Sequence, residues 1–192
     1  MSNKIRERTE KELQLQAKGL KEVTTLLSSF KIDYYLSGGT LLGIIRDGDF
    51  IKWDWDVEIA VPAEQIVPLR KQIVRALKNA YFEIYSITRS RINYKINAVK
   101  YGCRYEIMAY VLKENERVRL RSKMPARFFS KGGTVTLRGF EFAALHPPKE
   151  YLNYNYGDWK VPVKSTRRSD YTTKKSRSPV SIIKWIRNIM GI

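Results

Sequence analysis

The stretch that decides the fold runs from residue 34 to residue 62 and reads YYLSGGTLLGIIRDGDFIKWDWDVEIAVP. A short apolar run ends at Leu36, a glycine pair follows at Gly38 and Gly39, and a helical pattern begins at Thr40. Acidic residues alternate with apolar ones from Asp54 onward. A glycine turn that enters a helix and precedes an acidic strand predicts a site for phosphate and metal.

The acidic part of this stretch, residues 53–61, alternates as a β-strand does. Side chains two residues apart on a strand share one side, so Asp54, Asp56 and Glu58 are expected to line one face. The residues between them are expected to point into the core. Three carboxylates on one face repel each other, and a divalent cation relieves that repulsion most simply. We therefore predict Mg²⁺ as the cofactor, with Mn²⁺ as the alternative metal, and these three acids as its ligands. The other interpretation is a solvated edge strand whose acids pair with nearby lysines.

The glycine turn supplies the expected phosphate contacts. Backbone N–H groups of Gly38 and Gly39 can approach phosphate oxygens closely, and a helix N-terminus favours negative charge. Thr40 is expected near the N-cap of a short helix that ends around Arg46. A guanidinium suits bidentate phosphate binding. The predicted substrate-binding residues are therefore Gly38, Gly39, Thr40 and Arg46.

A third site acid is expected from a neighbouring strand. Glu106 is the best candidate, because it is an acid between apolar residues in the strand-like run RYEIM. It could hold a metal or take the proton of an attacking hydroxyl. The alternative is a salt bridge from Glu106 to Arg104 or Lys95. The predicted catalytic residues are Asp56, Glu58 and Glu106.

The pattern around this stretch predicts the remaining elements. Helices are expected at residues 5–30 and 62–80, the second weakened by Pro68. Strands are expected at residues 82–88, 94–101 and 104–112, with shorter ones within 127–142, and a last helix opens at Pro147. This order indicates an α/β (α+β) fold with a mixed sheet flanked by helices.

Length and composition bound the function. The 192 residues suit one domain, placed at 1–163, followed by a basic linker and an amphipathic helix at 164–192. The formal charge of +17 favours anionic partners, although a merely soluble basic protein is the plainer interpretation. One cysteine, Cys103, allows no intramolecular disulfide, and with one histidine, His146, a zinc site is excluded.

The two ends of the chain suggest its location. The charged N-terminal residues resemble neither a signal peptide nor an anchor, and no apolar run approaches the ~20 residues that span a bilayer. A cytoplasmic location is therefore expected. The basic run and the helical apolar face within 164–192 suit an anionic leaflet, so peripheral binding to the inner membrane face is predicted. The alternative is a terminal helix that packs on the domain.

Residues 34–162 resemble the LicD family, which includes fukutin and fukutin-related protein and lies in the nucleotidyltransferase-fold superfamily. The Gly-Thr-Leu-Leu-Gly stretch, Arg46 and the Trp53-Asp54 segment fall on the signature of that family. Residues 138–142, 146–152 and 154–159 resemble its C-terminal stretch. Three positions depart from the family pattern: Trp55, where another Asp is common, and Glu58 and Glu106, where Asp is commoner.

The resemblance implies a nucleotidyltransferase (polymerase-β-like) core. It implies a Mg-dependent transferase that moves a phospho-alcohol, such as phosphocholine or ribitol phosphate, from a CDP-activated donor to a hydroxyl of a cell-surface glycan. Lipopolysaccharide or teichoic acid are acceptors of that kind, and the acceptor could be lipid-linked. The same resemblance makes Asp54, Asp56 and Glu58 the metal strand and Glu106 the third acid.

Two other functions fit parts of this pattern. The first is transfer of NMP to a small molecule, a protein or an RNA end, which uses the same glycine turn and acidic pair but releases pyrophosphate. The second is a non-catalytic basic module for nucleic acid, which predicts salt-dependent binding without an effect of Mg²⁺. Nucleic acid is not the expected partner, because the aromatic residues fall mostly on core positions of strands.

Overall fold

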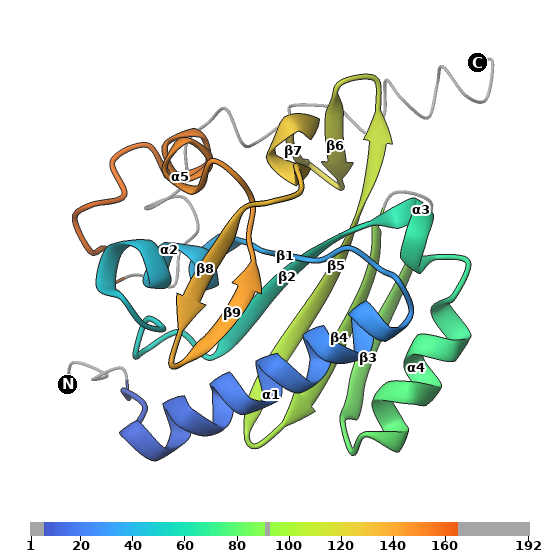
Figure 1. The fold of residues 1–192 in the computed structure, drawn as a ribbon, viewed down its shortest axis with the longest axis horizontal. Coiled ribbons are helices and arrows are strands. Elements are labelled where there is room, and N and C mark those ends of the chain that lie inside the picture. The colour runs from blue at the N-terminus through green and yellow to red at the C-terminus, as the bar shows by residue number, and fades with distance from the viewer. Residues whose placement is uncertain (1–5, 91–92, 165–192) are drawn as a thin grey trace.

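The computed structural model describes residues 6–90 and 93–164, and a mixed β-sheet forms its centre (Figure 1). Its strands lie in the order β1-β2-β5-β4-β3, and β5 extends into a hairpin of β6 and β7. The strands are β1 (Tyr35–Leu36), β2 (Asp56–Pro62), β3 (Glu83–Ser90), β4 (Asn93–Lys100), β5 (Cys103–Lys113), β6 (Glu116–Arg119) and β7 (Ser122–Pro125). The central β2 and β5 pair in parallel, and the other neighbours are antiparallel.

Two helices cover one face of this sheet. Helix α1 (Glu10–Ser29) lies across the sheet and α4 (Arg70–Asn79) lies beside it (Figure 1). Apolar residues on one side of α1, among them Leu20, are fully buried in the same core cluster as the strand residues Ile59 and Ile107. The other face of the sheet carries polar side chains at one end of β5, such as Glu106, and buried apolar ones farther along, such as Tyr110 against Phe129.

The remaining elements flank β2. Helix α2 (Gly38–Asp47) connects β1 to the loop before β2, and α3 (Ala63–Ile66) follows β2. The 3₁₀ turn η1 (Ala126–Phe129), the hairpin of β8 (Thr134–Leu137) and β9 (Phe140–Ala143), and α5 (Pro148–Tyr156) complete the described chain. Helices α2 and α5 lie on the same side of the molecule (Figure 1).

Several predicted elements start or end elsewhere than expected. Helix α1 begins at Glu10 because Thr9 forms a capping box with Glu12. The predicted helix at 62–80 is broken into α3 and α4 around Pro68, which cannot donate a helical hydrogen bond. The hairpin of β6 and β7 was not predicted, because both strands have only four residues, β6 is mostly charged, and β7 ends in Pro125.

The predicted α/β fold with a mixed sheet flanked by helices is confirmed, whereas the boundary between 1–163 and 164–192 stays a prediction. The expected C-terminal amphipathic helix lies outside the described residues. Within the part of the chain that the structure describes, none of the helices is long and apolar enough to cross a membrane.

The packing of α1 on β5 yields a stability prediction. A Cβ at Gly19 would lie 2.1 Å from the Tyr105 hydroxyl, so the backbone of α1 approaches this ring as closely as glycine allows. We expect Gly19→Val to lower the free energy of unfolding by roughly 1–3 kcal/mol through overpacking, measured by urea denaturation. Thr25→Val, on the exposed side of α1, is the matched control. Equal urea midpoints for the two variants would contradict this packing.

Candidate active site

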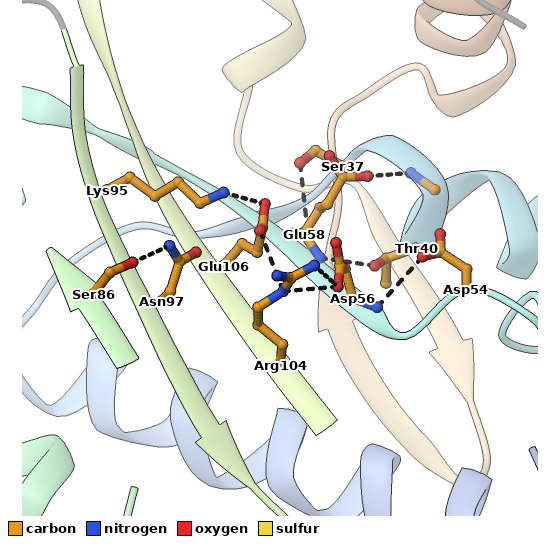
Figure 2. Close-up of polar contacts among 11 residues, drawn as sticks. Ser37, Thr40, Asp54, Asp56, Glu58, Ser86, Lys95, Asn97, Arg104 and Glu106 are labelled. Atoms are coloured by element: carbon orange, nitrogen blue, oxygen red, sulfur yellow. Dashed lines mark hydrogen bonds and ion pairs between the residues drawn. The ribbon is translucent and has the colours of Figure 1, made fainter. Parts of the chain in front are cut away.

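The polar side chains of the sheet gather on the face that α1 and α4 leave uncovered. Tyr105 points toward α1, because its hydroxyl donates to a backbone carbonyl of that helix over 3.1 Å. Arg104 and Glu106 therefore point to the opposite face. In the parallel register Asp56 lies opposite Arg104, and Glu58 lies opposite Glu106. The three predicted catalytic acids thus come together on two adjacent strands (Figure 2).

Glu58 lies directly against the N-terminus of α2. Its carboxylate accepts a hydrogen bond from the backbone N–H of Gly39. Its own backbone N–H donates to the hydroxyl of Thr40 over 2.9 Å. Thr40 therefore joins α2 to β2 from within the helix, and the expected N-cap position is occupied by Ser37 instead.

The two glycines let acidic side chains approach this helix end. A Cβ at Gly38 would lie 1.8 Å from a Glu58 oxygen, and one at Gly39 would lie 2.4 Å from Oδ2 of Asp54. Gly38 also has a φ of +53°, in the left-handed region that favours glycine. The positive end of the helix dipole favours negative charge at this place.

The N–H groups of the glycine pair already have acceptors within the protein. The N–H of Gly39 donates to Glu58, and that of Gly38 donates to the hydroxyl of Tyr151 over 3.0 Å. Tyr151 belongs to α5, in the stretch 146–152 that resembles the C-terminal part of the LicD pattern. The two halves of the resemblance therefore meet in space, while the predicted phosphate contacts of Gly38, Gly39 and Thr40 stay a prediction.

Asp54 lies in the loop before the acidic strand, because β2 begins only at Asp56. Its Oδ1 accepts from the backbone N–H of Asp56 over 3.3 Å, a local bond that competes with strand pairing. The expectation that three acids alternate along one strand is therefore wrong for Asp54. Burial, together with the neighbouring charge of Asp56, raises the pKa of the Asp54 carboxyl to about 6.

The loop that carries Asp54 is held by the N-terminal segment. The backbone N–H of Arg8 donates to the carbonyl of Lys52 over 2.9 Å. The guanidinium groups of Arg6 and Arg8 lie over the ring of Trp55, 4.9 and 5.2 Å from its centroid. Trp55 was expected in the core, but it is only partly buried and packs against these two cations.

Two cations neutralise the acids on β2 and β5. Arg104 donates to Oδ1 of Asp56 over 2.8 and 2.5 Å, and its Nε lies 3.6 Å from Glu106 (Figure 2). Nζ of Lys95 lies 2.6 Å from the other oxygen of Glu106. Both ion pairs considered as the alternative for Glu106 are therefore present. Burial disfavours the charged form of Arg104, but its bonds to Asp56 raise the pKa of the guanidinium.

Asn97 and Ser86 belong to this polar face and were not predicted from sequence, whereas Lys95 was named there as a partner of Glu106. Lys95 and Asn97 of β4 point to the same side as Glu106, and Asn97 donates to the hydroxyl of Ser86 over 2.6 Å (Figure 2). In β4 these polar residues alternate with buried ones such as Ile96. That alternation is visible in the sequence and would have placed Asn97 beside the acids.

Arg46 is not brought to the start of α2. It lies in the last turn of the helix, eight residues and about 12 Å along the axis from Gly38. Its guanidinium donates to both carboxylate oxygens of Asp47 over 2.8 and 2.7 Å. A contact of Arg46 with substrate phosphates stays a prediction.

The donor set was tested against the predicted Mg²⁺. Residues 6–90 and 93–164 contain no group of three or more His, Cys, Asp or Glu side chains that could hold a metal ion. Magnesium commonly needs only one or two carboxylates, with water and substrate phosphates as its other ligands. Asp54 and Asp56 fit that requirement, since both offer oxygen ligands. They also lie close together, because the charge of Asp56 raises the pKa of Asp54.

The sequence of this chain is similar to those of several known proteins. The family described as LicD/FKTN/FKRP, nucleotidyltransferase domain, matches residues 31–136. Ribitol 5-phosphate transferase FKRP of Homo sapiens and of Mus musculus are each 41% identical over 44 residues, which are 23% of this chain and 9% of FKRP. An uncharacterized protein of Rickettsia prowazekii (strain Madrid E) is 25% identical over 149 residues, 73% of this chain and 53% of that protein.

Two solved structures share the fold. The lincosamide antibiotic adenylyltransferase LnuA, lincomycin-bound, superposes with a TM-score of 0.51 at 14% identity, covering 79% of this chain and 89% of LnuA. The antibiotic-resistance factor ANT(2'')-Ia superposes with a TM-score of 0.51 at 13% identity, covering 85% of this chain and 80% of that protein. At these identities the likeness concerns the fold alone.

The raised pKa of Asp54 predicts how stability depends on pH. A carboxyl whose pKa rises on folding stabilises the protein below its ordinary pKa, 3.8 for Asp54, and loses that contribution as pH rises through about 6. Between pH 4 and pH 7 we expect this group to lower the free energy of unfolding of the metal-free wild type by roughly 1–2 kcal/mol, a value reduced for solvent screening. Asp54→Asn should lack this loss.

The measurement is urea denaturation of both proteins in EDTA at several pH values. Glu114→Gln, in the exposed turn between β5 and β6, is the control for a lost carboxylate. Parallel pH profiles for wild type and Asp54→Asn would show that Asp54 does not titrate in this window.

Proposed function

The chain belongs to the LicD/FKTN/FKRP family of nucleotidyltransferase domains, and from this premise we propose that it is a transferase of phospho-alcohol groups. The proposed donor is a CDP-activated alcohol, and the proposed acceptor is a hydroxyl of a cell-surface glycan. Phosphocholine and ribitol phosphate are the candidate cargoes, the second because FKRP is by name a ribitol 5-phosphate transferase. The matched segment is only 9% of FKRP, so this activity is carried over as a proposal.

The observation that supports the proposal best is the register of the two central strands. Glu58 on β2 lies opposite Glu106 on β5, and Asp56 lies on the same face two residues before Glu58. Phosphoryl transfer depends mainly on positioning and on electrostatic stabilisation of phosphate charge. Acidic side chains grouped beside a helix N-terminus suit that chemistry. The acids can hold a divalent cation, and the backbone N–H groups of the helix favour negative charge.

We propose that Mg²⁺, or Mn²⁺ in its place, is held by Asp54 and Asp56, with Glu58 next to them at the start of α2. When bound, the metal would neutralise the donor diphosphate and the leaving nucleotide. Asp54 must be ionised to contribute, and its pKa of about 6 leaves it largely charged at neutral pH. The N–H of Gly39 orients the Glu58 carboxylate toward the start of α2.

The acceptor side of the reaction is assigned to Glu106. In an in-line displacement the acceptor hydroxyl attacks phosphorus, its oxygen forms the new bond, and CMP leaves. Glu106 is proposed to take the hydroxyl proton. Lys95, whose Nζ lies 2.6 Å away, orients the Glu106 carboxylate. Because only 9% of Glu106 is exposed, the proton stays within the site.

The second candidate is transfer of NMP to a small molecule, a protein or an RNA end. LnuA, whose fold this chain shares, is by name an enzyme of this reaction class, an antibiotic adenylyltransferase. The two reactions differ in the bond that breaks, so the released product separates them. A basic nucleic-acid module remains a third candidate, distinguished by binding that Mg²⁺ does not change.

The acceptor also bears on where the protein acts. We propose a cytoplasmic enzyme that meets a lipid-linked glycan at the inner membrane face through the basic residues of 164–192. Co-sedimentation of the full chain with anionic vesicles, compared with a chain lacking residues 180–192, tests this. Equal sedimentation of both forms would show that residues 180–192 make no contact with the membrane.

Asp56→Asn tests the catalytic assignment. The amide keeps the size of the side chain but removes the negative charge that the metal requires. We expect kcat to fall at least ~100-fold, with an unchanged circular dichroism spectrum. Glu114→Gln should retain full turnover, and near-normal turnover by Asp56→Asn would exclude Asp56 from the reaction.

Product analysis tests the reaction class. The full chain is incubated with Mg²⁺, a panel of CDP-linked alcohols and glycan acceptors, and the products are identified by mass spectrometry. Release of CMP together with a phospho-alcohol on the glycan is the expected result. Pyrophosphate released from a nucleoside triphosphate, without CMP from any CDP-linked donor, would favour NMP transfer instead.

A further inference from the structure

Arg104 links the two strands that carry the site acids. Its Nε and one terminal nitrogen donate to the same oxygen of Asp56, over 2.8 and 2.5 Å. The same Nε lies 3.6 Å from an oxygen of Glu106. One guanidinium therefore occupies the space between two carboxylates of the proposed site, as Figure 2 shows.

We propose that Arg104 exchanges partners when the enzyme loads its substrate. It leaves Asp56 as the divalent cation binds, and it then contacts the phosphate oxygens of the nucleotide donor. This inference rests on the proposed function, because it assigns a donor-binding residue within the same site.

The first half of the exchange follows from charge and exposure. A guanidinium and a divalent cation repel each other, and both cannot use the same oxygen of Asp56 at full strength. The Arg104 side chain is 43% exposed, so it can swing away without leaving a buried charge unpaired. Lys95 differs, since it is only 18% exposed, and it remains to neutralise Glu106.

The second half follows from the position and shape of the side chain. Arg104 lies directly opposite Asp56 in the parallel register, so its freed head stays beside that carboxylate. Metal ions in phosphoryl transfer bridge protein carboxylates to phosphate oxygens, so donor phosphates would lie within reach. A planar guanidinium can then bind two phosphate oxygens at once.

The exchange has a thermodynamic consequence. Without donor, Arg104 competes with the metal for Asp56, and metal alone binds weakly. With donor present, the phosphates accept the displaced guanidinium, so metal and nucleotide strengthen each other's binding. Arg104 thus makes the binding of the divalent cation and of the nucleotide donor cooperative.

The test uses one variant and two ligands. Arg104→Gln removes the guanidinium charge, so we expect Mn²⁺ alone to bind on the order of tenfold tighter than to wild type, counted by electron paramagnetic resonance. The same variant should bind CDP in the presence of Mg²⁺ about 10- to 100-fold more weakly, measured by calorimetry. Arg75→Gln, an equal charge change on the exposed side of α4, should leave both affinities unchanged.

Tighter Mn²⁺ binding together with weaker CDP binding separates this role of Arg104 from a structural one. Equal Mn²⁺ affinity in wild type and Arg104→Gln, or a weakening of both ligands together, would overturn the exchange while leaving the metal site intact. Arg104→Lys should keep the weak Mn²⁺ binding of wild type, because it retains the charge. Failure of wild type to bind Mn²⁺ at all would overturn both this inference and the metal part of the proposed function.

Discussion

Several acidic side chains share one half-buried corner where β2, β5 and α2 meet, and the local structure is organised around their mutual repulsion. The acids are Asp54, Asp56, Glu58 and Glu106. Like charges this close are costly unless each is compensated. Backbone N–H donation from Gly39 compensates one, Arg104 and Lys95 compensate two, and a pKa near 6 relieves the fourth. A cation that binds phosphates offers the same relief.

The glycine pair makes this corner possible. At Gly38 and Gly39 a Cβ would collide with carboxylate oxygens, so any side chain there would push the acids away from the helix end. Tyr151 completes the arrangement from α5, more than 100 residues away in the chain. The family pattern in two distant segments is therefore one spatial unit, in which helix start, acids and α5 support one another.

Periodicity and spacing predicted much of this arrangement. The alternation at 53–61 and the apolar run around Glu106 placed Asp56, Glu58 and Glu106 on neighbouring strands, which the register confirms. The position of Asp54 could not be predicted in this way, because its side chain binds the Asp56 N–H and the strand begins only at Asp56. The sequence offered Lys95 as an ion-pair partner of Glu106, and the structure confirms that contact. The contact of Asn97 with Ser86 followed only from the fold, because strand pairing is long-range.

The central claim is that Asp54 and Asp56 hold a divalent cation against a nucleotide phosphate. Crystals of the full chain grown with Mn²⁺ and CDP would test it through the anomalous signal of manganese. We predict a peak in contact with Asp54 or Asp56 and a phosphate oxygen of CDP, with Arg104 turned from Asp56 toward that phosphate. A manganese peak elsewhere on the protein, or CDP bound away from these acids, would contradict the account.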